Sequence, residues 1–372
     1  MAKPVKILLI VLAVLLLLLG AVCIATGIIM KQQFGRGSYP DRKYYSYYWY
    51  DPDYSSTHKR ENVQFVSGRN TLQGYLYGPE HLEDGAEPPK GIIVFAHGIG
   101  SGHEAYINTL MWFVDRGWVV FAYDATGCCT SEGDGSVGLV QSALDLDAAL
   151  HVTEQDERLK GLPVCLLGHS WGGYAVCGVQ NFDHNLTAAC SISGYAYPLE
   201  MLQEGAVQTV GKPLAAVFRP FAAGYHNLTF GQYAGLNAVD GINHAGIPEF
   251  ILHGEMDTTV PYEGISILSK QKQITNPHVR YETITGPYAD HNLFFSSDAA
   301  NAYKEEFNAQ GKALEAQYNG DIPQEVRDAA YASRNLPLIN EVNTELLQTI
   351  EQFYLDAIAG TDDTAATMRM ME

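Results

Sequence analysis

Short apolar segments recur along the chain at intervals filled by helical patterns, and this alternation constrains the fold more than any other feature. The segment at residues 91–96 is wholly apolar, as in a strand whose sheet is covered on both faces. Apolar side chains recur at helical spacing over residues 106–115 and 137–152. Strands that alternate with helices predict an α/β protein with a mostly parallel, doubly wound sheet. The predicted strands are residues 91–96, 118–123, 163–167, 188–192, 249–253 and 279–284.

Further segments surround this sheet. Residues 63–66 and 71–77 flank a turn and predict an antiparallel hairpin. The interval from about 194 to 246 is too long for a loop and falls between two strands, near the edge where open α/β sheets bind ligands. We therefore expect a helical cap insertion there. A second helical insertion is predicted at 296–336, followed by an amphipathic helix at 340–358.

The N-terminus predicts a membrane anchor. Ile7 to Met30 is almost entirely apolar and is long enough to cross a bilayer of about 30 Å. The sequence around Cys23 is a poor cleavage site, which favours an uncleaved signal anchor over a signal peptide. Both flanks are basic, so charge does not set the orientation. Because the N-terminal tail is so short, we expect a single-pass membrane protein with residues 1–30 as its anchor and the domain that follows outside the cytoplasm.

Residues 31–62 form a polar, tyrosine-rich juxtamembrane linker between the anchor and a domain at 63–372. Aromatic residues gather at membrane interfaces, but such a segment can equally fold back on its domain, and the sequence leaves both interpretations open. The tyrosines are Tyr39, Tyr44, Tyr45, Tyr47, Tyr48, Tyr50 and Tyr54.

Composition excludes some partners. The net charge of −19 argues against nucleic acid, because a phosphate-binding surface needs a basic face. The cysteines show no C-x-x-C spacing and are interpreted as buried apolar residues, and a metal site at Cys128 and Cys129 is not expected. No metal site and no cofactor are predicted, and the oligomeric state stays open.

The strand at 163–167 runs directly into Gly168-His169-Ser170-Trp171-Gly172, which matches G-x-S-x-G. A helix is predicted to follow. A strand, a sharp turn bearing serine and then a helix are the context of a nucleophile elbow, in which Ser170 projects above the sheet. The flanking glycines are needed because a Cβ there would collide with the neighbouring backbone.

A serine nucleophile needs a base, and the base needs a carboxylate to orient it. In this fold the chain order is serine, acid, histidine. Asp257 follows the strand at 249–253, and His291 follows the last strand, so we predict a triad with Ser170. Glu255 and Asp290 are rival acids, the first expected to face solvent and the second too close to His291 in sequence. His97, His169 and His253 are interpreted as packing residues.

An oxyanion hole needs two backbone N–H groups aimed at the developing charge. The residue after the nucleophile, Trp171, should supply one. The loop after the strand at 91–96 reads His97-Gly98-Ile99-Gly100, and Ile99 is the expected second donor.

With these motifs the chain resembles the α/β-hydrolase family over about residues 63–360. Asp124-Ala-Thr126-Gly127-Cys-Cys129-Thr-Ser131 also resembles a loop of the serine aminopeptidase and monoacylglycerol-lipase-like branch, usually D-x-R-G-x-G-x-S. Thr126 replaces the arginine of that pattern and Cys129 its second glycine. The resemblance implies an α/β-hydrolase fold that hydrolyses an ester, thioester or amide through an acyl-enzyme, without a metal or organic cofactor.

The resulting hypothesis is a membrane-anchored serine hydrolase that cleaves a carboxylic ester of a small-molecule acyl substrate. A peptidase or aminopeptidase of the same fold is the alternative enzyme. A non-catalytic binding protein on a hydrolase scaffold is the alternative from another class, and a complete Ser-Asp-His set argues against it.

Overall fold

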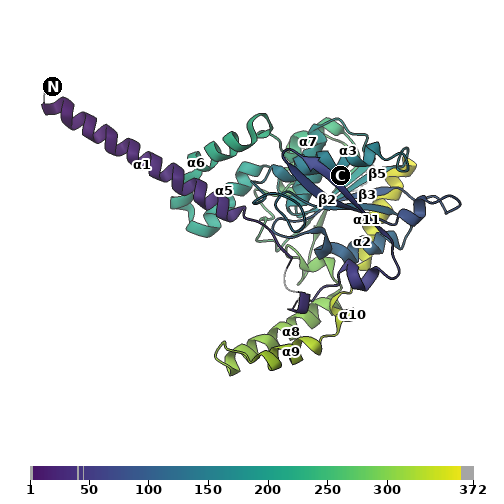
Figure 1. Cartoon of the computed structure of the whole chain (residues 1–372). Helices are drawn as coiled ribbons and strands as arrows, with labels where there is room; N and C mark the ends of the chain where they lie inside the picture. Colours follow the sequence, from purple (N-terminus) through teal and green to yellow (C-terminus); the bar gives the residue numbers. More distant parts are fainter. Residues whose placement is uncertain (1–2, 40–41, 45, 362–372) are drawn as a thin grey trace.

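The computed structural model describes residues 3–39, 42–44 and 46–361. Within this part of the chain, one sheet with the strand order β1-β2-β4-β3-β5-β6-β7-β8 crosses the centre of the molecule (Figure 1). Strand β2 pairs antiparallel with β1 and with β4. All other neighbouring strands, from β4 to β8 in this order, are parallel. The predicted, mostly parallel sheet is thus confirmed. The strands are β1 Arg60–Ser67, β2 Asn70–Tyr77, β3 Ile92–Ala96, β4 Val119–Asp124, β5 Val164–His169, β6 Ala188–Ile192, β7 Glu249–Gly254 and β8 Val279–Ile284.

Helices cover both faces of the sheet, which explains why the central strand β3 is wholly apolar. Along β3, Ile92 and Val94 pack into the hydrophobic cluster on one face, whereas Ile93 and Phe95 pack into the cluster on the other. The first face is covered by α3 Gln141–Gln155, α4 Trp171–Gly178 and α7 Ala238–Ala245, and the second by α2 Ile107–Val114 and α11 Thr344–Ala359.

The predicted cap interval holds three helices with two different roles. Helices α5 (Pro198–Val210) and α6 (Lys212–Phe230) pack on each other, and α6 also packs on α1 (Figure 1). The side chain of Gln208 in α5 donates a hydrogen bond of 3.0 Å to the carbonyl oxygen of Thr258, in the loop after β7. Helix α7 packs instead on α4, as part of the layer that covers the sheet.

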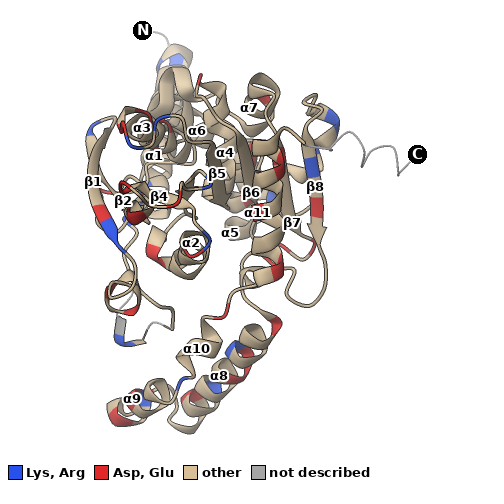
Figure 2. Ribbon diagram, turned by 90° about the vertical axis from the view of Figure 1, so that its right-hand side faces the viewer, with Lys and Arg blue, Asp and Glu red and all other residues tan. Residues whose placement is uncertain are grey.

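The second predicted insertion forms α8 (Asp298–Gln317), α9 (Gln324–Ala332) and α10 (Leu336–Ile339), which project from the sheet domain (Figure 1). Acidic and basic residues are mixed along α8 and α9 (Figure 2). The Nζ atom of Lys43, in the tyrosine-rich linker, lies 2.8 Å from a carboxylate oxygen of Asp328 in α9. This insertion is therefore in contact with the linker.

The apolar N-terminal segment forms one helix, α1 (Lys3–Gln33), which is long and apolar enough to cross a membrane. Most of its apolar side chains are exposed, but Thr26 and Met30 near its end are buried. Phe34 follows the helix and is also buried. The last turns of α1 therefore pack against the folded domain. Met1 and Ala2 of the predicted anchor lie outside the described residues.

The tyrosine-rich linker folds back on the domain in the part that is described. The Tyr39 hydroxyl donates a hydrogen bond of 2.8 Å to Asp124, and the Tyr50 backbone N–H donates one of 2.7 Å to Glu104. Arg36 donates to the backbone carbonyls of Cys129, Ser131 and Gly133, in the loop after β4, at 2.7–2.9 Å. These contacts fit the interpretation of a linker that folds back on its domain, one of the two that the sequence leaves open. Tyr45 of this segment and the C-terminal residues 362–372 lie outside the described part.

Candidate active site

Ser170 lies at the sharp turn between β5 and α4. Its backbone has φ 59° and ψ −112°, a conformation that residues other than glycine rarely adopt. A Cβ built at Gly168 would collide with the carbonyl of Gly172, and one at Gly172 would collide with the carbonyl of Ala96. The steric reason for both glycines in the predicted elbow is therefore present.

The structure brings the three predicted triad residues together, although they are up to 121 positions apart in the sequence. The Ser170 Oγ lies 2.8 Å from Nε2 of His291, and Nδ1 of His291 lies 2.6 Å from a carboxylate oxygen of Asp257. This geometry fits the tautomer in which Nδ1–H donates to the carboxylate and Nε2 accepts the serine proton. All three residues are buried, with Ser170 8% exposed.

Asp257 is held as a carboxylate by several donors. Its other oxygen accepts the backbone N–H groups of Thr259 and Val260, both at 2.9 Å. His253 Nε2 lies 3.2 Å from the oxygen that faces His291. Burial raises the pKa of Asp257, but hydrogen bonds from His253 and His291 outweigh it, so the pKa lies well below its ordinary value. A negative charge therefore persists beside His291.

The rival acids lie elsewhere. Glu255 is exposed and accepts the backbone N–H of Gly286 at 3.2 Å. Asp290 accepts the backbone N–H groups of Asn292 and Leu293, at 2.8 and 2.7 Å. Both carboxylates hold loops, in agreement with the choice of Asp257.

The two predicted oxyanion donors flank Ser170. Trp171 is the first residue of α4, and a Cβ built at Gly98, next to Ile99, would lie 3.6 Å from the Ser170 Cβ. Among the residues that the structure describes, the backbone N–H groups of Ile99 and Trp171 donate to no other group. Both N–H groups are therefore free for an incoming oxygen.

His169 and Tyr106 have a role that sequence reasoning missed. The Tyr106 hydroxyl donates to Nδ1 of His169 at 2.7 Å and accepts the backbone N–H of Gly98 at 3.2 Å. Nε2 of His169 donates to the carbonyl oxygen of His291 at 2.8 Å. This chain of bonds joins the oxyanion loop, the elbow and the backbone of the triad histidine. Burial, with the nearby His291 ring, lowers the pKa of His169 to about 3, so its ring stays neutral.

The loop after β4 contains both departures from the family pattern. Thr126 is fully buried, and its N–H and hydroxyl donate to Asp145 at 2.7 and 2.8 Å. Cys129 has φ 44°, a left-handed conformation that favours the glycine of the pattern. Asp124 accepts bonds from His103 at 2.8 Å and from Thr130 at 2.6 Å. The loop is thus pinned by buried polar contacts.

His97 is a packing residue, as the sequence predicts. Its Nε2 accepts the backbone N–H of Ala125 at 2.9 Å, and its Nδ1 donates to the carbonyl of Gly98 at 2.7 Å. A cavity of about 420 Å³ lies behind the loop that carries His291, and none of the three triad residues lines it. Asp290 and Asn292, the neighbours of His291, line it together with Tyr106 and Phe295.

Part of this chain is similar in sequence to known hydrolases. Residues 87–198 match the family model of serine aminopeptidases. Human monoglyceride lipase is 35% identical over 85 residues, which make up 23% of this chain and 28% of the lipase. The chain thus matches little more than a quarter of the length of that relative.

Solved structures share the fold at lower identity. An esterase of Pyrococcus furiosus is 16% identical, with a TM-score of 0.50, and the match covers 76% of this chain and 98% of the esterase. An acylaminoacyl peptidase of Pyrococcus horikoshii is 16% identical, with a TM-score of 0.49, over 63% of this chain and 38% of the peptidase. This chain has the α/β-hydrolase fold, and its sequence is similar to the serine aminopeptidase and monoacylglycerol-lipase-like branch of that family.

Proposed function

We propose that this protein is a membrane-anchored serine hydrolase that cleaves a carboxylic ester through a Ser170–His291–Asp257 triad. The observation that carries the proposal is the continuous hydrogen-bonded chain from the Ser170 Oγ through His291 to Asp257. Two free backbone N–H groups beside Ser170 support it, because a nucleophile and an oxyanion hole are the two parts that acyl transfer needs.

In the first half of the reaction, the Ser170 Oγ attacks the acyl carbon while Nε2 of His291 takes the hydroxyl proton. The carbonyl oxygen becomes an oxyanion and accepts the N–H groups of Ile99 and Trp171. The carboxylate of Asp257 stabilises the imidazolium of His291. The imidazolium then gives its proton to the departing alkoxide, so an alcohol leaves and the acyl group stays on Ser170.

In the second half, a water molecule replaces the alcohol. His291 takes one of its protons as the water oxygen attacks the acyl carbon, and the same two N–H groups hold the new oxyanion. When that intermediate collapses, His291 returns the proton to the Ser170 Oγ and the carboxylic acid is released. No metal or organic cofactor enters these steps.

Hydrolysis of a short-chain p-nitrophenyl ester by the full-length protein tests the proposal. We expect Ser170→Ala and His291→Ala each to lower kcat by about 10⁴-fold or more, because the triad acts as one unit. A fluorophosphonate probe should label the unaltered chain at Ser170. A folded protein without an adduct at Ser170 would favour the non-catalytic binding protein, and full activity in either variant would refute the residue assignment.

The surroundings of α1 support a substrate that is reached from a membrane. Helix α6 of the cap packs on α1, and apolar side chains of α6 are exposed: Leu214 by 53%, Val217 by 59% and Leu228 by 89%. With α1 across a bilayer, these side chains would lie in or near the headgroup layer, where apolar surface is stabilised.

We propose a single-pass protein with its hydrolase domain outside the cytoplasm, which protease digestion of sealed membranes would test.

A peptidase remains the second enzymatic candidate, because the matching family model is that of serine aminopeptidases. A panel of ester, thioester and aminoacyl-amide substrates separates the two. We expect the ester to have the largest kcat/KM, and a larger value for the amide would reverse the order of the candidates.

A further inference from the structure

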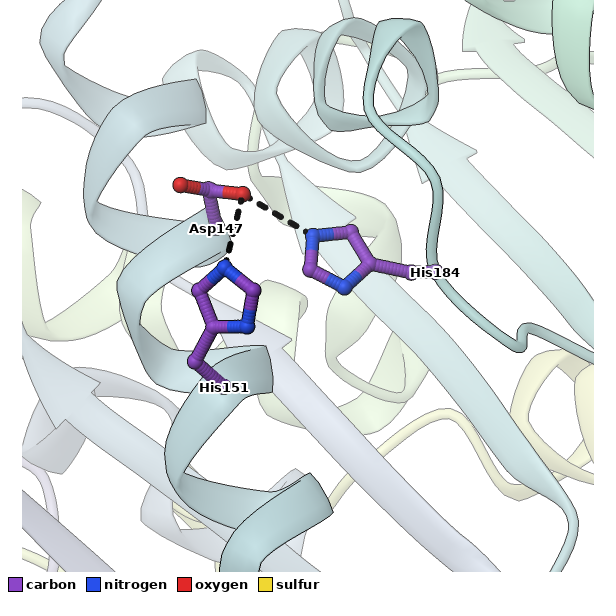
Figure 3. Close-up of side chains that lie close together, drawn as sticks. All are labelled: Asp147, His151 and His184. Carbon is purple, nitrogen blue, oxygen red and sulfur yellow. Dashed lines mark hydrogen bonds and ion pairs between the residues drawn. The ribbon is translucent and has the colours of Figure 1, made fainter.

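Two histidines and two carboxylates gather on the outer side of α3, remote from the triad. Asp147, His151 and Glu154 follow one another on α3 at spacings of four and three residues, which places them on one face of the helix. His184 approaches them from the loop before β6 (Figure 3). Ser170, Asp257 and His291 follow the carboxyl ends of their strands, whereas His184 precedes its strand. The cluster therefore lies at the opposite edge of the sheet.

Three ligand atoms converge in this cluster. One carboxylate oxygen of Asp147 lies 3.0 Å from Nε2 of His184 and 3.7 Å from Nε2 of His151 (Figure 3). These three atoms all lie within 4.8 Å of one another. A tetrahedral ion with bonds of about 2.0–2.1 Å separates its ligand atoms by roughly 3.3 Å, so small side-chain shifts would accommodate one.

The carboxylate of Glu154 faces the other nitrogen of both rings. One of its oxygens lies 2.8 Å from Nδ1 of His184, and the other lies 3.2 Å from Nδ1 of His151. A carboxylate only accepts hydrogen bonds, so this arrangement favours a proton on each Nδ1. Nε2 of His184 also lies at hydrogen-bond distance from a carboxylate oxygen, 3.0 Å from Asp147. An N–H there can donate to that oxygen, and a metal ion would take the place of this proton between the two atoms.

We propose that Asp147, His151 and His184 bind one divalent transition-metal ion of the zinc class. Imidazole nitrogen with one carboxylate oxygen suits such ions, whereas magnesium and calcium prefer oxygen ligands. Glu154 orients both rings by accepting their Nδ1 protons, the part that outer carboxylates take at histidine metal sites. Asp147 and His151 line a cavity of about 640 Å³, from which water can reach the fourth position of the ion.

One ligand of the proposed site is buried and the other two are accessible to solvent. The side chain of His184 is 1% exposed, whereas those of Asp147 and His151 are 28% and 57% exposed. The ion would join α3 to the loop before β6, two segments otherwise connected by side-chain contacts. We therefore assign it a structural role, separate from ester hydrolysis.

Metal titration of the full-length protein in detergent tests the proposal. The protein is stripped with a chelator, and Zn²⁺ binding is measured by competition with a chromophoric chelator. We expect one Zn²⁺ per chain, an upward shift of Tm on binding, and visible absorption bands of tetrahedral Co²⁺ when cobalt replaces zinc. Asp147→Asn and His151→Gln should each weaken binding by at least about tenfold, and Glu154→Gln by about 10–100-fold.

The matched control is His244→Gln, because His244 also faces a carboxylate, Asp183 at 3.3 Å, but lies outside the cluster. Zinc binding should be unchanged in this variant. The exposed position of His151 keeps the test valid if a change at buried His184 prevents folding. Absence of a site, or equal affinity in His151→Gln and the unaltered chain, would overturn the proposal. Ester hydrolysis should persist in all four variants, so the metal site and the proposed function can fail independently.

Discussion

Ser170 combines a side chain with a backbone conformation suited to glycine. Such conformations cost about 1–3 kcal/mol, and the surrounding elbow must supply that free energy. The strain lifts the Oγ out of the sheet and toward His291. Because the cost belongs to the Cβ and not to the hydroxyl, it can be measured apart from catalysis.

We expect Ser170→Gly to be more stable than Ser170→Ala by about 1–2 kcal/mol, since only glycine relieves the backbone strain. Urea unfolding of the two inactive variants measures the difference. At a regular helical position such as Ala148 in α3, the change to glycine should instead destabilise by about 0.5–1 kcal/mol. Equal stability of the two Ser170 variants would contradict a strained elbow.

His169 predicts a pH dependence of stability. Its pKa is about 3 in the folded protein, against about 6.5 in an unfolded chain. Between these values the unfolded state binds more protons, so the free energy of unfolding decreases as the pH falls from about 6.5 toward 3. This one group contributes a slope of up to about 1.4 kcal/mol per pH unit.

The variant His169→Gln should lose this contribution, because glutamine does not titrate but retains a donor and an acceptor. Its unfolding free energy should therefore fall less steeply below pH 6.5 than that of the unaltered chain, as measured by urea unfolding at several pH values. Parallel curves would show that the ring is not held neutral between Tyr106 and the carbonyl of His291.

At the scale of elements, α1 and α6 are in contact and both carry exposed apolar side chains. Helix α6 lies against α1, and Leu214 and Val217 near its start are more than half exposed. In water these exposed side chains contribute no free energy of apolar burial, whereas a bilayer around α1 would bury them.

We expect Leu214→Ser with Val217→Ser to lower hydrolysis of a bilayer-embedded long-chain ester by about tenfold, through loss of apolar contact with lipid. Hydrolysis of a short soluble ester should stay unchanged, because neither residue belongs to the triad. Leu336→Ser in α10 is the control, being an exposed leucine of the distant insertion. An equal loss on both substrates would place the defect in the cap's packing and not in membrane contact.

At the scale of the whole molecule, the sheet could be predicted because its central strands are mostly apolar. A short apolar run such as residues 91–96 is typical of a strand that is buried on both faces. Asp257 and His291 could be predicted because the fold fixes the order in which its strands end. The link from Tyr106 through His169 to His291 could not, since it joins two side chains and a backbone carbonyl from three remote segments and leaves no periodic pattern. For the same reason, tyrosine content alone did not show that Tyr39 reaches Asp124.

Two truncations test how α1 joins the domain. Removal of residues 1–24 keeps the buried Thr26, Met30 and Phe34, whereas removal of 1–36 deletes them together with Arg36. We expect the free energy of unfolding of the protein without residues 1–24 to exceed that of the protein without residues 1–36 by about 2–4 kcal/mol, because the former retains these apolar side chains. Urea unfolding, with short-chain ester hydrolysis as a check of the site, measures this. Equal stability would mean that the end of α1 contributes nothing to the domain.

The bonds from Arg36 to the loop after β4 have a consequence for kinetics. They hold the end of α1 directly against the domain. If α1 crosses a bilayer as proposed, that bilayer also fixes the height and tilt of the elbow above the lipid. Diffusion of the protein is then confined to a plane, and encounter with a lipid ester depends on its mole fraction in that plane. Dilution of the ester with inert lipid, at constant bulk concentration, should slow turnover in proportion.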